Sequence, residues 1–238
     1  MNFRKIFLLI VVALPLALFA QTDAERQPIS LRTTAEYGYN YAWRHYGTLS
    51  VNGYFPINRY FDLSAGVLVN TANQYAFDGR AIVNFPLKVG RLALENRFLY
   101  RYFAGYDTHE LNAALSLGYA MNYFRVSAGF CGKLYGQAPF WADGDNAAFV
   151  AEPFNLLWNI EVHARPDSCA WNLGLRASNF DDFQIERFNQ PIFTLMGRYD
   201  FNQHWRLFAD VACKPAGVFH VTANFYGINT HLGFIYTW

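Results

Sequence analysis

The feature that most constrains this chain is a two-residue alternation of apolar with polar or small side chains, which continues to the last residue, Trp238. Counting back from Trp238 to Ile228, every second residue is Tyr, Phe, Leu, Thr or Ile, and the residues between them are mostly small or polar. Neighbouring side chains of a β-strand point to opposite faces, so this period predicts a strand with one apolar face. The same period recurs at 31–43, 61–70, 111–119, 155–163 and 205–212. The sequence therefore predicts an all-β fold.

Short segments of turn-forming residues separate these runs. They lie at 56–59, 88–90, 121–123, 166–168 and 202–204, and each is short enough for a tight hairpin. Each interval between two turns has room for a strand, a connecting loop and a returning strand. With the two end strands, this spacing predicts about twelve strands, within a range of about ten to fourteen.

The terminal run resembles the C-terminal signature of bacterial outer-membrane β-barrels, in which a final Phe or Trp is preceded by aromatic residues at every second position. Here Trp238 follows Tyr236 and Phe234. The resemblance implies a closed antiparallel transmembrane β-barrel over 30–238, with short periplasmic turns, longer external loops and outer-membrane lipid and lipopolysaccharide around it. It also implies that the barrel-assembly machinery reads the last strand. The alternating runs are close to the 9–11 residues that a tilted membrane strand needs. A soluble β-sandwich is the alternative.

The N-terminal residues have the pattern of a secretory signal peptide. Arg4 and Lys5 precede an apolar run from Ile6 to Phe19, which Ala20 ends. The run is shorter than the roughly 20 residues of a membrane-spanning helix, so we expect a cleaved signal peptide at 1–20 and a short periplasmic tail at 21–29. An uncleaved anchor helix is the alternative. The expected location is the outer membrane of a Gram-negative cell, and the short tail argues against a plug or passenger domain.

The composition narrows the class of partner and site. Aromatic residues make up 19% of the chain while its mean hydropathy is only +0.01, which fits alternation better than a large apolar core. The net charge of +1 gives no reason to expect nucleic acid. The spacing of Cys131, Cys169 and Cys213 matches no metal-ligand set, and whether two of them pair is left open. We expect no metal and no cofactor.

The polar faces of the strands would line the barrel interior, because a charge facing lipid at mid-bilayer costs about 2–4 kcal/mol. Hairpin register predicts that Glu161 lies near Arg176, His163 near Asn172, Asp200 near Arg206 and Asp210 near His231. One interpretation is that these groups only neutralise each other and stiffen the wall. The candidate lumen residues are Arg80, Arg91, Glu95, Arg97, Arg101, Arg125, Glu161, His163, Arg176, Arg198, Asp200, Arg206, Asp210 and His231.

Aromatic residues gather near the strand ends at two heights. This sorting is typical of membrane barrels, because amphipathic rings prefer the headgroup level. The candidate girdle residues are Tyr39, Tyr41, Trp43, Tyr100 and Tyr102 at one end, and Trp171, Trp205, Tyr236 and Trp238 at the other.

The leading functional hypothesis is a narrow pore or transport channel for small, anionic solutes. About twelve strands lie between a filled small barrel and a wide porin, and Arg91, Arg97 and Arg101 form a file of positive charge along one strand. The loops at 137–150 and 181–190 are expected on the external face.

Two other functions remain open. One is a non-conducting structural or interaction barrel in an envelope complex. The other is a barrel-embedded hydrolase, which would use Ser127, Glu161 and His163 in the lumen or a rim loop that carries Asp143 and Asp145. No catalytic residue is assigned, and a solvated turn is the simpler interpretation of the rim loop.

Overall fold

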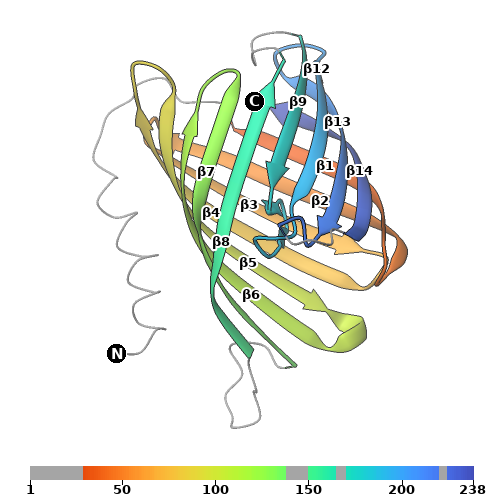
Figure 1. The fold of residues 1–238 in the computed structure, drawn as a ribbon. Helices are drawn as coiled ribbons and strands as arrows, with labels where there is room; N and C mark the ends of the chain where they lie inside the picture. The colour runs from red at the N-terminus through yellow and green to blue at the C-terminus, as the bar shows by residue number, and fades with distance from the viewer. Residues whose placement is uncertain (1–28, 138–149, 165–169, 220–223) are drawn as a thin grey trace.

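The computed structural model describes residues 29–137, 150–164, 170–219 and 224–238. Twelve of its strands form one closed barrel (Figure 1). These strands are β1 (Ser30–Asn40), β2 (Arg44–Asn58), β3 (Phe61–Asn70), β4 (Gln74–Pro86), β5 (Arg91–Phe103), β6 (Thr108–Ala120), β7 (Phe124–Gly136), β8 (Val150–His163), β9 (Trp171–Ser178), β12 (Ile192–Asp200), β13 (Trp205–Ala216) and β14 (Asn224–Thr237). A single 3-10 turn spans Ala104–Tyr106.

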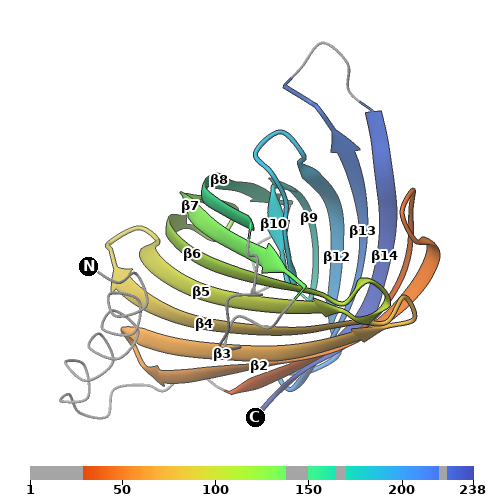
Figure 2. The same cartoon turned by 90° about the horizontal axis from the view of Figure 1, so that it is seen from below.

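Each barrel strand pairs antiparallel with its neighbours in the chain, and β1 pairs with β14 to close the ring (Figure 2). The closing register sets Leu31 opposite Tyr236 and Glu36 opposite His231. The predicted closed antiparallel barrel of about twelve strands is confirmed. Among the described residues, no helix is long and apolar enough to cross a membrane.

The alternation in the sequence sorts side chains between the outer surface and the lumen. Leu49, Leu115 and Leu175 are exposed on the outer surface, while Asn112 and Asn229 are buried inside. A soluble domain would bury the leucines and expose the asparagines. The inverted sorting fits a barrel whose solvent outside is lipid, because apolar side chains then need no cover and polar ones do.

One end of the barrel carries the predicted tight turns, although the connections from β1 to β2 and from β3 to β4 at the other end are also only three residues long. Tight turns follow β2, β4, β6 and β12, as the sequence predicts, while the predicted turn at 166–168 lies outside the described residues. The turn after β4 needs Gly90, whose φ is +75° and whose added Cβ would lie 2.3 Å from the carbonyl oxygen of Ala120. We call this end the turn end and the opposite one, where β1 leads into β2, the loop end.

Between β9 and β12 the chain leaves the wall and folds into the lumen. Residues 179–191 contain two short paired strands, β10 (Phe180–Asp181) and β11 (Gln184–Ile185). We call this segment the inward hairpin. The prediction that 181–190 lies on the external face is wrong. Asn179 marks the point of departure, because its side chain accepts from the backbone N–H of Trp158 at 2.9 Å and donates to the carbonyl of Leu156 at 2.8 Å.

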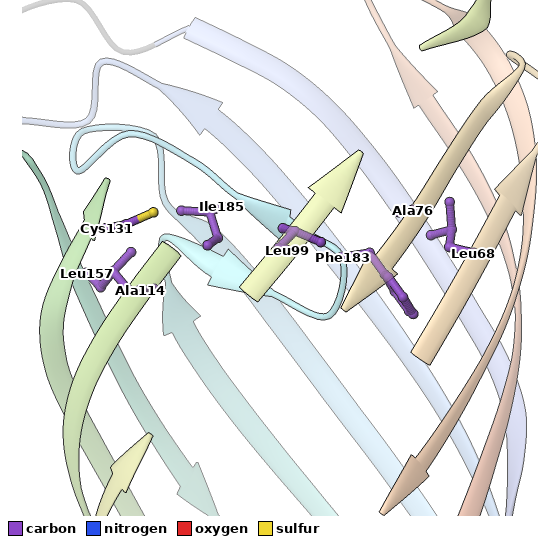
Figure 3. Packing of buried hydrophobic residues seen from close by; sticks show 8 residues of the cluster. All are labelled: Leu68, Ala76, Leu99, Ala114, Cys131, Leu157, Phe183 and Ile185. Carbon is purple, nitrogen blue, oxygen red and sulfur yellow. The ribbon is translucent and has the colours of Figure 1, made fainter. Parts of the chain in front are cut away.

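An apolar cluster holds the inward hairpin against the wall. Phe183 and Ile185 are 4% and 1% exposed. They pack against one lumen-facing side chain from each of six consecutive strands, β3 to β8 (Figure 3). These wall residues are Leu68, Ala76, Leu99, Ala114, Cys131 and Leu157. The cluster is the main apolar core of the described interior, and it exists only because the hairpin enters.

The tip of the inward hairpin is strained. Phe183 has φ +63°, in the left-handed region that a bulky residue seldom adopts. Such a conformation costs of order 1–3 kcal/mol and persists only where other contacts impose it. Burial of the Phe183 ring supplies those contacts, so the conformation of the turn depends on the packing of this ring against the wall.

Candidate functional site

Two cavities lie in the lumen, one on each side of the inward hairpin. The loop-end cavity has a volume of about 260 Å³ and reaches from Asn40 and Phe103 down to Arg32. The turn-end cavity has a volume of about 190 Å³ and is lined by Glu95, Ser127 and other residues of β5 to β8. Three residues line both cavities: Arg176, Asp181 and Asp182. These three therefore mark the place where the hairpin divides the lumen.

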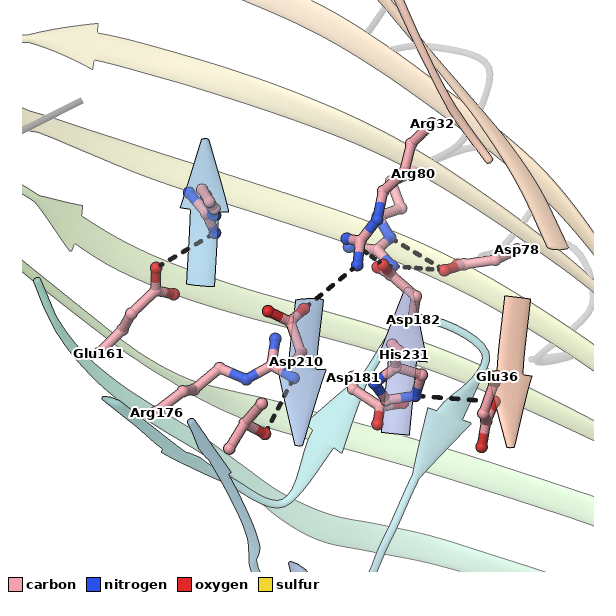
Figure 4. A network of polar contacts seen from close by, with 12 residues as sticks. Arg32, Glu36, Asp78, Arg80, Glu161, Arg176, Asp181, Asp182, Asp210 and His231 are labelled. Carbon is pink, nitrogen blue, oxygen red and sulfur yellow. Dashed lines mark hydrogen bonds and ion pairs between the residues drawn. The ribbon is translucent and has the colours of Figure 1, made fainter. Parts of the chain in front are cut away.

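Asp182, at the tip of the hairpin, is held by two arginines from different strands. Its carboxylate accepts from Arg80 of β4 at 2.6 Å and from Arg32 of β1 at 3.0 Å (Figure 4). Burial by itself would raise the pKa of Asp182, but the nearby guanidinium groups, Arg80 and Arg32 first, lower it well below its ordinary value. The hairpin thus carries a fixed negative charge that ties it to two sides of the barrel.

The hairpin backbone is also anchored by cations of the wall. Arg97 donates to the carbonyl oxygen of Asp181 at 2.7 Å and to both carboxylate oxygens of Asp78 at 2.9 Å. Lys133 donates to the carbonyl oxygen of Ile185 at 3.3 Å. The contacts to Asp181 and Ile185 use wall side chains to satisfy carbonyl groups of the hairpin that have no partner in a sheet of the wall.

The arginines of the predicted file on β5 do not share one environment. Arg97 is buried against Asp78, and Arg101 forms an ion pair with Glu110 at 2.7 Å. Arg91 is exposed at the turn end, and Glu95 lines the turn-end cavity. Arg97 and Arg101 therefore form ion pairs within the wall and do not form a continuous row of unpaired charge.

The register of the predicted pairs is as expected, but the partners are only partly so. His163 lies 2.8 Å from Asn172, and Arg206 donates to Asp200 at 3.0 Å. Glu161 faces Arg176 across β8 and β9, yet it contacts His163 at 2.5 Å, Arg125 at 3.3 Å and Arg198 at 3.9 Å instead.

The fourth pair shows the same exchange of partners. Asp210 faces His231 across β13 and β14. The ion pairs instead join Asp210 to Arg32 at 3.7 Å and His231 to Glu36 at 3.7 Å. Side chains reach along the wall to partners on other strands, so strand register alone does not determine which charged groups pair.

Arg176 remains without an ion pair in the described part of the lumen. Its single hydrogen bond is a long one, from Nη2 to the hydroxyl of Thr194 at 3.5 Å, and its buried Nε has no partner. Asp181 lines the same two cavities and attracts Arg176 electrostatically, without forming an ion pair with it. Burial raises the pKa of Asp181, which lies on the hairpin and faces both cavities.

The geometry does not favour the predicted lumen hydrolase. A serine nucleophile needs a histidine nitrogen that is free to accept its proton. Both ring nitrogens of His163 are already within hydrogen-bond distance of Asn172 and Glu161, and Ser127 lines the cavity without being a partner of either nitrogen. The rim loop with Asp143 and Asp145 lies outside the described residues.

Most of the predicted girdle residues lie at the two ends of the barrel. Tyr39, Tyr41, Tyr100 and Tyr102 are at the loop end, and Trp171, Trp205, Tyr236 and Trp238 are at the turn end. Trp43 departs from this pattern. β1 ends at Asn40, whose side chain accepts from the backbone N–H of Trp43 at 2.7 Å, and the resulting turn brings Trp43 to the mouth of the loop-end cavity.

The cysteines and potential metal ligands make no further site in the described part of the chain. Cys131 and Cys213 are free thiols, and Cys169 lies outside the described ranges. Within those ranges, no three of the His, Cys, Asp and Glu side chains gather as a metal site.

The barrel is similar to solved barrels of bacterial outer membranes. The KdgM porin, solved in complex with disordered oligogalacturonate, gives a TM-score of 0.53 at 11% identity over 88% of this chain and 99% of that one. For Omp33 of Acinetobacter baumannii the TM-score is 0.50 at 11% identity, with 90% and 99% covered. This chain has the fold of a bacterial outer-membrane β-barrel.

A third solved structure shows how widely this barrel fold is used. The translocator domain of the autotransporter NalP from Neisseria meningitidis gives a TM-score of 0.54 at 13% identity, with 99% of this chain and 95% of that one covered. Porins and an autotransporter thus share this architecture, so the likeness concerns the fold. No protein-family profile matches the sequence, and no curated protein matches it.

The inward hairpin is the part of the site that sequence reasoning missed. A signal for it existed, because Leu68, Ala114 and Leu157 fall on the polar side of their alternating runs. Apolar residues on a lumen face need a cover, and no strand of the wall supplies one. A segment that carries Phe183 and Ile185 supplies it.

Proposed function

We propose that this barrel is a pore of the outer membrane for small, anionic solutes, and that the inward hairpin forms its constriction. The observation that carries the proposal is the pair of cavities that meet at Arg176, Asp181 and Asp182. A barrel filled by side chains would have no such chambers on both sides of one segment. In this proposal the turn end faces the periplasm, the signal peptide is cleaved and the assembly machinery reads the last strand.

The preference for anions rests on the residues around the constriction. Arg32, Arg80, Arg97 and Arg176 converge there from four different strands. Three of the carboxylates there, those of Asp78, Asp182 and Asp210, are already paired with arginines. Fixed guanidinium groups at a narrow point attract anions and repel cations.

A crosslink between hairpin and wall tests the proposal. Ile185 packs in the same cluster as the native Cys131, so Ile185→Cys places two thiols there (Figure 3). In planar bilayers, we expect small conductance steps from the wild type. The oxidised variant should lose its fluctuations between levels, and reductant should restore them. Ile185→Cys combined with Cys131→Ser is the matched control, since it cannot form this link.

A second function is favoured by the strength of the hairpin's anchoring. Both ion pairs and apolar contacts hold it in place, as a permanently closed structural barrel would require. Absence of conductance from the wild type, the reduced variant and the control alike would contradict the pore and support the structural barrel.

A further inference from the structure

The arginines of the lumen differ in one respect that matters for a solute. Arg32, Arg80, Arg97, Arg101 and Arg198 each have a carboxylate partner. Arg176 has none in the described lumen, although Glu161 stands directly opposite it in the sheet. Glu161 is held by Arg125 and Arg198 and contacts His163. Arg176 is therefore left with only the longer-range attraction of Asp181 and Asp182, and its guanidinium can bind a further anion.

The position of Arg176 makes its charge accessible to a solute. It lines the loop-end cavity and the turn-end cavity alike, so an anion can reach it from either side of the hairpin. Thr194 lies opposite Arg176 in β12, is 2% exposed, and holds one end of the guanidinium by a long hydrogen bond. The buried Nε has no acceptor, which leaves a donor of the fork unsatisfied.

We infer that Arg176 is the solute-binding residue of the constriction and that it holds the carboxylate group of a small organic anion as the anion passes from one cavity to the other. A guanidinium fork matches the two oxygens of a carboxylate, which favours this group over a spherical ion. The cavity volumes of about 260 and 190 Å³ lie below the ~300–1,000 Å³ typical of drug-sized ligands, so the solute is small. The inference rests on the proposed pore.

The role of Thr194 is to position Arg176. Its hydroxyl is absent from the lining of both cavities, so it reaches the solute only through the guanidinium. Thr194→Val should therefore weaken binding less than the loss of the charge does, with no change in the charge selectivity of the pore.

Succinate and its neutral analogue succinamide are suitable probes. In planar bilayers, succinate should reduce the chloride current of the wild type in a saturable way, and succinamide should not. Arg176→Gln should raise the half-blocking succinate concentration about tenfold or more, because one charge-assisted contact is lost. Arg176→Lys keeps the charge without the fork and should fall between the two.

The matched control is Arg206→Gln, because Arg206 pairs with Asp200 at the turn end and lines neither cavity. It should leave the block unchanged. Equal block of the wild type and Arg176→Gln would overturn the inference while the pore itself still conducts. Inorganic phosphate forms a separate arm, and block by phosphate at lower concentration than by succinate would overturn the carboxylate assignment.

A binding measurement keeps the inference testable if no current is found. Succinate should raise the unfolding temperature of the detergent-solubilised wild type and of Arg206→Gln, since a ligand of the folded state stabilises it. Arg176→Gln, if it shows the same resistance to unfolding without ligand, should lose this rise. A rise of equal size in Arg176→Gln would refute the assignment whether or not the barrel conducts.

Discussion

The barrel wall and the inward hairpin are held in place by different kinds of interaction. Neighbouring wall strands share long ladders of backbone hydrogen bonds, such as the pairing of β5 with β6 from Arg91 to Phe103. The two short strands of the hairpin pair only with each other, at two residue pairs. Side chains fix the segment to the wall, together with a backbone hydrogen bond from the N–H of Asn179 to the carbonyl oxygen of Trp158 at 3.2 Å. Moving a wall strand breaks a whole ladder, whereas moving the hairpin breaks a few separable contacts. We therefore expect the hairpin, and not a wall strand, to be the part of the lumen that changes position.

The largest effect is expected from removing the apolar contacts that hold the hairpin against the wall. Truncation of a buried Phe or Ile costs about 2–5 kcal/mol at each site, and Phe183 also needs these contacts to stay in a left-handed conformation. Phe183→Ala combined with Ile185→Ala should leave the barrel assembled but free the hairpin. Single-channel conductance should rise several-fold above that of the wild type.

The matched control truncates an apolar side chain of the wall. Leu175 is 64% exposed on the outer surface, where lipid would fill the space that Leu175→Ala leaves. Its conductance should equal that of the wild type. If the control opened the pore as much as the double variant does, or if the double variant conducted no better than the wild type, the contrast between wall and hairpin would fail.

A smaller effect is expected from the ionic tie. Asp182→Asn removes the charge that joins the hairpin to Arg32 and Arg80 but keeps the apolar contacts. Both partners of the Arg32 pair are about one-third exposed, so the loss should be about 1–2 kcal/mol, between the values for exposed and buried pairs. We expect more frequent opening at unchanged full conductance, and a higher ratio of anion to cation permeability from reversal potentials. A lower ratio would contradict the proposed role of the two arginines.

The wall follows from the sequence, and the hairpin does not, for a physical reason. Strand faces are set by a local period of two, so the alternation up to Trp238 and the tight turns at Gly90 and elsewhere are enough to predict the barrel. Residues 179–191 contain Asp, Asn and Gln, which are equally typical of an external loop. Their inward course depends on Phe183 meeting Leu68 and its neighbours, a set of contacts spread over six strands.

The same difference explains the partly wrong partners in the lumen. Register places Asp200 opposite Arg206 at a tight turn, and there the predicted pair forms. In mid-barrel, Glu161 has Arg125, Arg198 and the ring of His163 within reach of its side chain and contacts those instead of Arg176. Pairing in a crowded lumen depends on side-chain reach in three dimensions, which strand register does not contain.

The smallest predicted effect concerns the two adjacent carboxylates of the hairpin, which differ in proton affinity. Burial raises the pKa of Asp181, while Arg80 and Arg32 keep that of Asp182 low. As the pH falls, Asp181 takes up a proton before Asp182 does, and the constriction then loses a negative charge. The ratio of anion to cation permeability should therefore rise modestly at lower pH.

The variant Asp181→Asn separates this effect from other groups that face Asp181. These are Arg176 of β9, Lys214 of β13 and His231 of β14, besides Asp182 itself. Asp181→Asn should show at neutral pH the higher ratio that the wild type shows only at lower pH. His231→Asn should keep the part of the pH response that belongs to Asp181, and a response abolished by His231→Asn but kept by Asp181→Asn would assign the titration to the wall instead of the hairpin.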